Sequence, residues 1–315
     1  MIQFVNAKIN LGLSVVGRRS DGYHLLETCF IPVGRHNGTP ENPEQFCDIL
    51  ELTEGEPEPV TCGKEGSEVY DEARVRFIFS GNPTDCPPEK NLIVKATRIF
   101  YQYLDQKGES SRREAQESLT LRLKKMIPDG AGHGGGSADA SFTLSMLNGH
   151  YGSPFSETEL EAMAVRLGAD CPVFIKNQIT FAEGIGEIFS PVESESVKSL
   201  AERPYWLAIV KPDLHISTAE AFAGLERGRP RIPLREALRL PVGEWKDAVA
   251  NDFEQSLFPR HPELARLKAA LYESGAIYAS MTGSGAALYG IFPSRTAARE
   301  AIADIDSPYA TVAKL

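Results

Sequence analysis

The sequence predicts an α+β protein with two parts, and three features of its pattern support this prediction. In the first half, the alternating strand 119–125 leads through a glycine-rich segment into an amphipathic helix. In the second half, the order strand, helix, strand, strand, helix, strand is typical of a ferredoxin-like domain. No repeat of solenoid spacing occurs, and 315 residues are enough for two ordinary domains. We place the boundary near residue 180, which gives domains at 1–180 and 181–315.

The first half begins with an apolar, strand-like stretch around Lys8. A loose segment from Gly34 to about Asp71, rich in Gly, Pro, Glu and Asn, encloses a strand at 46–52, and another strand follows at 74–80. From Asn91 the pattern becomes helical, because apolar residues recur with the period of an α-helix. The apolar stripe comprises Leu92, Ala96, Ile99, Phe100 and Tyr103.

Two further helices follow the glycine-rich segment. The first begins at Ser137 and is expected to stop at Gly149, since glycine ends many helices. The second begins at Ser156, where Glu159 three residues later completes a capping box, and ends at Gly168. In the second half we expect strands at 205–210, 277–281, 286–292 and 309–314, and helices at 262–272 and 295–305.

Composition and charge exclude several classes of function. The formal net charge of −10 argues against a general nucleic-acid or membrane-surface role, since both partners require a basic face. No apolar run approaches the roughly 20 residues of a membrane span, and the strand pattern begins at Met1, which leaves no room for a signal peptide. Five scattered cysteines are typical of free thiols in a reducing cytoplasm: Cys29, Cys47, Cys62, Cys86 and Cys171. We expect a cytoplasmic monomer or homodimer without nucleic-acid or membrane partners.

The segment Pro128–Ser137 contains five glycines in the seven positions 130–136. Glycine loses more backbone entropy on folding than any other residue, so an ordered glycine run is costly. A flexible linker is the alternative, but linkers do not usually stand between an amphipathic strand and an amphipathic helix. At a helix N-terminus, bare N–H groups and the helix dipole favour an anion. We therefore predict a phosphate-binding loop.

Two familiar phosphate loops do not fit this segment. Gly130, Gly132 and Gly135 satisfy the G-x-G-x-x-G spacing of dinucleotide-binding folds, but the acidic residue expected at the end of a second parallel strand is absent. A Walker A loop ends in Gly-Lys-Ser/Thr, whereas this loop ends in Gly136-Ser137 without a lysine. Both options fail, and these residues alone leave the type of loop open.

Lys8 and Asp170 are the candidate catalytic residues. Lys8 stands in an otherwise apolar strand, where a lysine is costly unless its charge is paired; an edge-strand lysine in water is the alternative. Asp170 stands among small or rigid residues that let it approach a ligand; a turn aspartate is the alternative. A carboxylate can accept the proton of a hydroxyl during phosphoryl transfer, and a nearby lysine can keep it ionised and neutralise the moving group. Ser137 has a hydroxyl suited to help hold Mg²⁺.

Other segments carry groups suited to ligands. Tyr23 offers a stacking face, and His24 can donate to or accept from a base edge; a hairpin turn with a surface histidine is the alternative. Phe222 is by default a core residue. The glycine-rich turn 281–287 is either an ordinary hairpin or a second backbone nest near the phosphates.

Together these segments resemble the GHMP kinases, named for galactokinase, homoserine, mevalonate and phosphomevalonate kinases. Residues 128–137 are similar to the ATP loop of that superfamily, and residues 282–286 to its C-terminal motif. More narrowly, the chain resembles the diphosphocytidyl-methylerythritol kinases over most of its length. The motifs that carry this resemblance lie at 7–11, 17–24, 91–93, 168–174, 181–184 and 251–254.

The resemblance implies a two-domain GHMP kinase fold, with an S5 domain 2-like ATP-binding domain followed by a ferredoxin-like domain. It also implies transfer of the γ-phosphoryl group of ATP to the 2-hydroxyl of 4-diphosphocytidyl-2-C-methyl-D-erythritol, on the non-mevalonate (MEP) route to isoprenoid precursors. Asp170 would be the general base and Lys8 its charged partner. Tyr23 and Phe222 would sandwich the cytosine, with His24 on its edge.

The remaining roles implied by the resemblance concern both substrates. Asn10 would orient the methylerythritol end and Thr218 would face the ribose or the diphosphate. Asn91 and Lys124 would lie near the nucleoside of ATP. The ATP phosphates would be held by Pro128, Gly130, Gly132, Gly134, Gly135, Gly136 and Ser137, with Mg²⁺ at Ser137.

Some residues depart from the family pattern. His133 stands where a leucine is common, and Ala138 where a second serine is common. Asp129 would repel ATP phosphates, so we expect its side chain to point away from them. The segment 53–71 is longer and more acidic than usual.

Three alternatives remain on the sequence. Another GHMP kinase, of the homoserine or mevalonate type, would still use Asp170 but would not need a cytosine clamp. A non-catalytic nucleotide-binding module would keep the glycine loop but would not need Asp170. A dinucleotide-binding oxidoreductase comes third, because its loop spacing is present without its acidic residue.

Overall fold

The protein was analysed as a computed structural model, which describes residues 1–34, 46–55, 67–72, 74–84, 86–114, 118–203, 205–225 and 232–315. The chain divides into two compact units, each made of several segments. The first unit comprises Met1–Asn6, Cys47–Asp129 and Gly134–Asn177, and the second comprises Ala7–Phe46, Gly130–His133 and Gln178–Leu315. The domain division at residue 180 stays a prediction. The expectations for Cys62 and for much of the loose segment 34–71 fall outside the described residues.

The first unit contains a sheet with the strand order β4-β5-β6-β3-β1, to which β1 contributes Ile2–Asn6. Strands β5 and β6 run parallel, and the other neighbours run antiparallel. The strands are β1 (Ile2–Arg18), β3 (Cys47–Glu54), β4 (Glu68–Glu72), β5 (Val75–Gly81) and β6 (Leu119–Lys125). The strands predicted at 46–52, 74–80 and 119–125 are thus confirmed.

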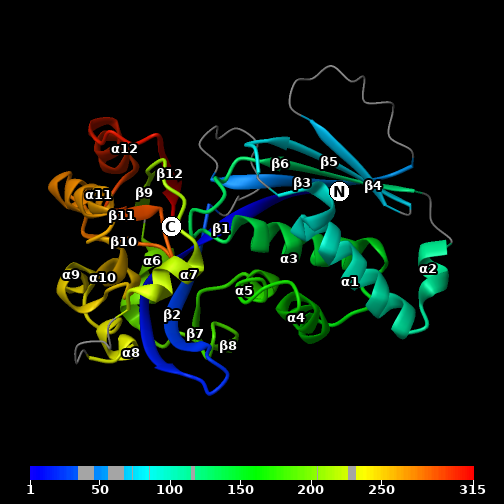
Figure 1. Cartoon of the computed structure of the whole chain (residues 1–315), viewed down its shortest axis with the longest axis horizontal. Helices are drawn as coiled ribbons and strands as arrows, with labels where there is room; N and C mark the ends of the chain where they lie inside the picture. Colours follow the sequence, from blue (N-terminus) through cyan, green and yellow to red (C-terminus); the bar gives the residue numbers. More distant parts are fainter. Residues whose placement is uncertain are drawn as a thin grey trace. The chain divides into compact units, whose positions relative to one another are not determined.

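The helices of the first unit are η1 (Pro88–Lys90), α1 (Leu92–Gln106), α2 (Ser110–Glu114), α3 (Gly135–His150), α4 (Glu157–Val165) and α5 (Val173–Lys176). Helix α3 contacts α1, β3, α4 and α5, so it lies at the centre of this unit (Figure 1). The capping box predicted at Ser156 and Glu159 is present, and the Asn91 side chain caps α1 by accepting a hydrogen bond from the Ile93 N–H at 3.1 Å.

The predicted ends of two helices were wrong by a few residues. Helix α3 begins at Gly135 instead of Ser137, because Gly134 adopts the left-handed conformation (φ 68°) that precedes the first turn. It continues through Gly149, which does not have the positive φ with which glycine commonly ends a helix. Helix α4 ends at Val165, before the predicted stop at Gly168.

The second unit contains two antiparallel sheets. In the first, the strand order is β1-β2-β7-β8, with β2 (His24–Val33), β7 (Thr180–Glu183) and β8 (Ile188–Ser190). The β1–β2 ladder is interrupted by a bulge between Leu11 and Leu13. Gly12 lies at this bulge with φ 71°, and a Cβ atom there would stand only 2.5 Å from Leu234 Cδ1. Glycine is therefore required at this position.

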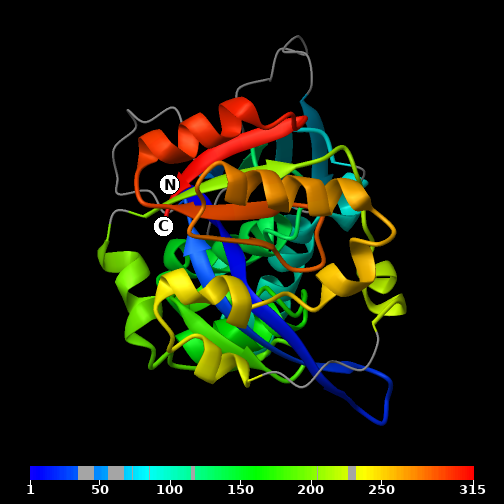
Figure 2. The same ribbon diagram turned by 90° about the vertical axis from the view of Figure 1, so that its left-hand side faces the viewer.

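The second sheet has the order β10-β11-β9-β12, which is the strand order of a ferredoxin-like fold. Its strands are β9 (Trp206–Lys211), β10 (Tyr278–Met281), β11 (Leu288–Phe292) and β12 (Tyr309–Lys314). Helices α11 (Pro262–Glu273) and α12 (Arg295–Asp304) cover one face of this sheet (Figure 2). The predicted order of strands and helices is confirmed.

Six shorter helices complete the described part of the second unit: α6 (Glu195–Glu202), α7 (Thr218–Ala223), α8 (Leu234–Ala237), η2 (Val242–Glu244), α9 (Trp245–Ala248) and α10 (Phe253–Leu257). Among the described residues, no helix is long and apolar enough to cross a membrane.

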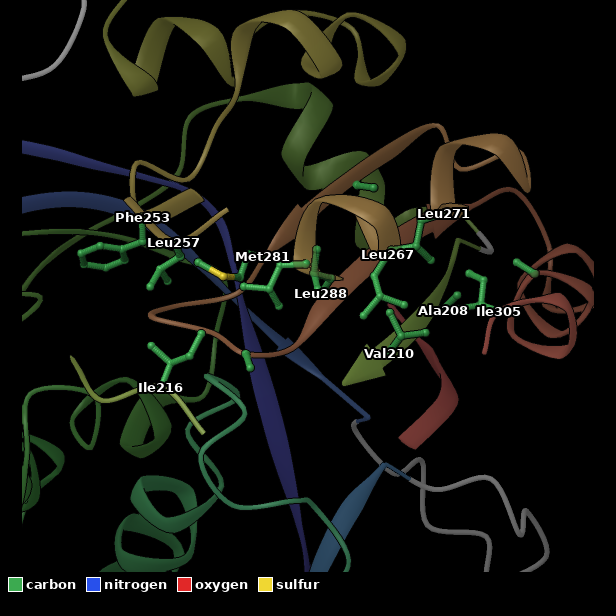
Figure 3. Packing of buried hydrophobic residues seen from close by; sticks show 14 of the residues in the cluster. Ala208, Val210, Ile216, Phe253, Leu257, Leu267, Leu271, Met281, Leu288 and Ile305 are labelled. Atoms are coloured by element: carbon green, nitrogen blue, oxygen red, sulfur yellow. The ribbon is translucent and has the colours of Figure 1, made fainter. Parts of the chain in front are cut away.

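The core of the ferredoxin-like part is one continuous apolar cluster (Figure 3). Val210 and Leu288 of the sheet pack with Leu267 and Leu271 of α11, and all four are almost fully buried. Burying a leucine side chain contributes about 2 kcal/mol, so this cluster holds the helices on the sheet. It extends to Met281, the last residue before the glycine-rich turn, and so gives that turn a rigid base.

Candidate active site

Lys8 is buried within β1 of the second unit, with only 2% of its surface exposed. Its ammonium group donates hydrogen bonds to Asn10 Oδ1 at 2.6 Å and to the carbonyl oxygen of Gly132 at 2.9 Å. It also lies 5.2 Å from the ring centre of Phe30. The alternative of an edge-strand lysine in water is therefore wrong. A buried ammonium is tolerated only with such partners, and it places a positive charge beside the glycine loop.

Residues 130–133 of the glycine loop turn their carbonyl groups toward the protein. The carbonyl oxygen of Gly130 accepts from the Ala286 N–H at 3.3 Å, and that of His133 accepts from the Lys8 N–H at 3.0 Å. None of the hydrogen bonds between described residues uses an N–H group of residues 130–133 as a donor. Gly130 and Gly132 have φ values of 62° and 76°. Left-handed residues of this kind occur in the backbone nests that bind anions.

The second glycine-rich turn packs directly against this loop. A Cβ atom on Gly132 would stand 2.1 Å from the Thr282 carbonyl oxygen, so the two backbones are in close contact. The turn is held from below by Asn251, whose Nδ2 donates to the carbonyl oxygens of Met281 at 2.9 Å and Gly283 at 2.8 Å. This close packing goes beyond an ordinary hairpin. The sequence motif at 251–254 did not reveal the part that Asn251 plays.

His133 is buried inside the loop and acts there as an apolar side chain. It is 1% exposed and packs edge-on against Phe46, with ring centres 5.0 Å apart. Among the described residues, neither of its ring nitrogens has a hydrogen-bond partner. Burial, with the nearby Lys8 charge, lowers the pKa of His133 to about 3. The imidazole is therefore neutral at physiological pH, which suits its apolar surroundings.

In the first unit, Ser137 and Asp170 meet at the thiol of Cys171. Asp170 lies half-buried in the turn between α4 and α5, and Ser137 lies in the first turn of α3. Burial raises the pKa of Cys171 to about 12, while a hydrogen bond from Ser137 lowers it and the charge of Asp170 raises it. Ser141 Oγ also donates to the Cys171 carbonyl oxygen at 2.6 Å. The backbone that carries Asp170 is thus tied to α3, the helix that follows the glycine loop.

Two neighbouring lysines end strand β6 before the loop: the predicted Lys124 and the next residue, Lys125. Lys124 is exposed, whereas Lys125 is buried between two carboxylates, 2.5 Å from Asp48 Oδ2 and 2.8 Å from Asp139 Oδ2. Burial lowers the pKa of Lys125, but these two charges together raise it above its ordinary value. The cluster joins the end of β6 to the start of α3, and Lys125 Nζ would lie 3.3 Å from a Cβ atom on Gly135. The sequence alone does not show which of these two lysines is buried.

The predicted cytosine-binding residues all belong to the second unit. His24 and Phe222 stack with ring centres 4.3 Å apart and planes 12° from parallel, and Phe222 also packs edge-on against Phe253. Tyr23 is 60% exposed. Thr218 is exposed and begins α7. The structure therefore brings His24 and Phe222 together, from positions about 200 residues apart in the chain.

Other predicted residues have simpler environments. Asn91 caps α1, as described above. Pro128 is half-buried, and Asp129 is exposed, as expected for a charge beside a phosphate loop. The described residues include no group of three or more His, Cys, Asp or Glu side chains able to hold a metal ion.

Comparison with known proteins identifies the family of the chain. Residues 91–178 match the GHMP kinases N terminal domain, and residues 234–311 match the GHMP kinases C terminal family. A 4-diphosphocytidyl-2-C-methyl-D-erythritol kinase of Parabacteroides distasonis is 42% identical over 300 residues, which cover 95% of this chain and 94% of that protein. The Bacteroides thetaiotaomicron kinase of the same name is 44% identical over 93% of this chain and 92% of its own.

A solved structure is similar over the whole length. The crystal structure of a 4-(cytidine 5′-diphospho)-2C-methyl-D-erythritol kinase covers 100% of both chains with a TM-score of 0.72 and 26% identity. The predicted resemblance and the two-domain α+β fold are thereby confirmed. The chain belongs to the GHMP kinases and, among them, to the family of the 4-diphosphocytidyl-2-C-methyl-D-erythritol kinases.

Proposed function

We propose that this chain transfers the γ-phosphoryl group of ATP to the 2-hydroxyl of 4-diphosphocytidyl-2-C-methyl-D-erythritol, on the MEP route to isoprenoid precursors. One observation carries this proposal: a buried ammonium, that of Lys8, donates a hydrogen bond to the carbonyl oxygen of Gly132 in the glycine loop. For phosphoryl transfer a protein mainly has to position the two substrates and neutralise the charge of the transferring group. The names of the relatives supply the identity of the acceptor.

In this mechanism Asp170 is the general base. Its carboxylate accepts the proton of the acceptor hydroxyl as the new P–O bond forms. The ties from Cys171 to Ser137 and Ser141 give the Asp170 turn a fixed position relative to α3. Lys8 neutralises the negative charge of the transferring group, a contribution that grows as the transition state is reached.

The ATP phosphates are expected at Gly130, Gly132, Gly134, Gly135, Gly136 and Ser137, with Pro128 at the entry to the loop. Asn91 and Lys124 remain the residues proposed near the nucleoside of ATP. Mg²⁺ is expected to enter with the phosphates. It typically keeps several waters and takes few protein ligands, so a single hydroxyl such as that of Ser137 fits its needs.

The cytidyl part of the acceptor is proposed to bind near the stacked pair His24 and Phe222. A cytosine ring would take the place of the His24 imidazole on the face of Phe222, opposite Tyr23, and His24 would turn to bond its edge. Asn10 would orient the methylerythritol end, and Thr218 would face the ribose or diphosphate. We place the enzyme in the cytoplasm, as a monomer or a homodimer.

The decisive test is ADP release with ATP-Mg²⁺ and a panel of alcohols. We expect turnover with the cytidyl-methylerythritol and little with homoserine or mevalonate, and no turnover once EDTA removes the metal. If only homoserine or mevalonate is phosphorylated, the chain is another type of GHMP kinase. No ADP with any alcohol would favour a non-catalytic module, and binding of NADH would favour the oxidoreductase.

Binding of cytidine nucleotides separates the acceptor assignment from the reaction class. CMP or CDP is expected to raise the melting temperature of the protein. Phe222→Ala is expected to weaken this binding by roughly 1–3 kcal/mol, the usual cost of a lost base stack. If CMP has no effect on wild-type unfolding and does not compete with substrate, the cytidyl assignment is wrong.

A further inference from the structure

The side-chain amide of Asn10 is held by partners on both of its ends. Asn10 is 2% exposed, and its Oδ1 accepts the 2.6 Å hydrogen bond from the Lys8 ammonium. Its Nδ2 donates to Thr28 Oγ1 at 3.0 Å. Its backbone N–H donates to Thr282 Oγ1 at 3.1 Å. The orientation of this amide therefore decides whether an oxygen or an NH₂ group faces Lys8.

The Thr28 hydroxyl donates its proton to the backbone at the bulge around Gly12. Because the β1–β2 ladder shifts register between Leu11 and Leu13, the Gly12 carbonyl oxygen is available to a side chain. Thr28 Oγ1, itself 1% exposed, donates to this carbonyl at 2.6 Å. A threonine hydroxyl has a single proton. Once that proton points to Gly12, the oxygen can only accept from Asn10.

We infer that Thr28 is a positioning residue for phosphoryl transfer, because it holds the NH₂ end of the Asn10 amide whose oxygen end accepts from the Lys8 ammonium. An acceptor at Thr28 requires the NH₂ end of the amide, so the oxygen end must face Lys8. The reversed amide would set NH₂ against NH₃⁺, two donors facing each other. This inference rests on the role proposed above for Lys8.

Removing the Thr28 hydroxyl leaves the amide held only at its oxygen end, where Lys8 and Thr282 Oγ1 donate to Oδ1 at 2.6 and 3.3 Å. Thr28→Val keeps the shape of the side chain but leaves the Asn10 NH₂ and the Gly12 carbonyl without their buried partner. We expect kcat to fall about tenfold, in line with the loss of a buried hydrogen bond. The KM values for ATP and acceptor are expected to change less than twofold, because Lys8 acts mainly on charge that develops in the transition state.

Two variants separate positioning from general damage. Thr28→Ser keeps the hydroxyl and is expected to restore most of the wild-type kcat. Thr97→Val is the matched control: Thr97 is also buried and donates to a backbone carbonyl, that of Ile93, at 2.9 Å in α1. Its kcat is expected to stay within twofold of wild type. A Thr28→Val enzyme at full rate, or a Thr28→Ser enzyme as slow as Thr28→Val, would overturn the inference.

A double-mutant cycle tests the path through Asn10. In an Asn10→Ala background, Thr28→Val is expected to lower kcat no further, since the residue through which it acts is gone. Additive losses would mean that Thr28 acts in some other way. Should Thr28→Val fail to fold, Thr28→Ala takes its place in the cycle, with the same expected outcomes.

The failure of this inference can be told apart from failure of the proposed function. Lys8→Met tests the latter: if it keeps the wild-type kcat, Lys8 does not take part in the reaction. In that event the Thr28–Asn10 cycle is measured in urea unfolding. Coupling between the two residues would support the amide orientation, and strict additivity would refute it.

Discussion

Asp170 is the residue to which the reaction is most sensitive in the proposed mechanism. Asp170→Asn keeps the size and the turn geometry but removes the base. We expect kcat to fall by a factor on the order of 10² or more, the usual loss for a general base. Steady-state ADP release measures it. Asp105→Asn, at an exposed position of α1, is the control and should keep full activity. An Asp170→Asn enzyme at near-normal rate would remove the proposed mechanism.

The burial of His133 in the glycine loop makes the stability of the folded chain depend on pH. The pKa of its imidazole is about 3 in the folded chain, against an ordinary value of 6.5, because burial and the Lys8 charge disfavour the proton. Between these two pH values the unfolded chain therefore binds more protons than the folded chain. The free energy of unfolding is thus not reduced by this histidine above pH 6.5, and it decreases as the pH falls below that value. Unfolding in urea at pH 7 and pH 5 should show a smaller loss for His133→Leu than for wild type. Equal losses would contradict the assigned environment.

Lys125 shows how one buried charge supports the region around the loop. Lys125→Met removes the cation from between the buried carboxyl groups of Asp48 and Asp139, and burial raises the pKa of Asp139 to about 8. We expect a loss of about 3–5 kcal/mol in unfolding free energy, typical when one partner of a buried ion pair is removed. Lys124→Met, at the exposed neighbouring position, should change stability by less than about 0.5 kcal/mol. Similar losses for both variants would count against a structural role for this cluster.

At the scale of elements, the contact between the two glycine turns depends on the absence of a side chain at Gly132. A Cβ atom there would lie 2.1 Å from the Thr282 carbonyl oxygen, on a backbone with φ 76°. Gly132→Ala must push the turns apart, and we expect a stability loss of about 1–3 kcal/mol beyond the cost of the φ angle alone. ATP binding, measured by calorimetry, should weaken as well.

Gly108 provides a matched control for that substitution. It has the same φ of 76°, but a Cβ atom would meet nothing within 4 Å. Gly108→Ala therefore isolates the cost of the backbone conformation, about 1–2 kcal/mol for a residue with a Cβ atom in the left-handed region. If the two variants lose equal stability and bind ATP equally well, the turns do not pack as described.

Most elements were predictable because their signals are local. The alternation at 119–125 and the capping box at Ser156 depend on neighbours in the chain, and both were confirmed. The exact start of α3 was missed because it depends on the left-handed conformation of Gly134. A sequence pattern predicts the presence of a helix more reliably than it predicts the residue at which the helix begins.

At the scale of the whole molecule, the sequence by itself determined the class of fold and the family, while the phosphate loop stays a prediction. These are carried by short motifs and by the order of elements, and each can be recognised without knowing any contact between distant residues. The burial of Lys8 was also suggested by its apolar flanks, although its partners were not.

Only the tertiary structure decided which side chains meet. The ion pair of Lys125 with Asp139, the stacking of His24 on Phe222, and the hydrogen bonds of Thr28 with Gly12 and Asn10 all join residues on different elements. A sequence shows that a threonine is present, but not to which oxygen its one proton goes. That is set by packing, because hydrogen bonds depend on distances and directions that exist only once the strands are paired.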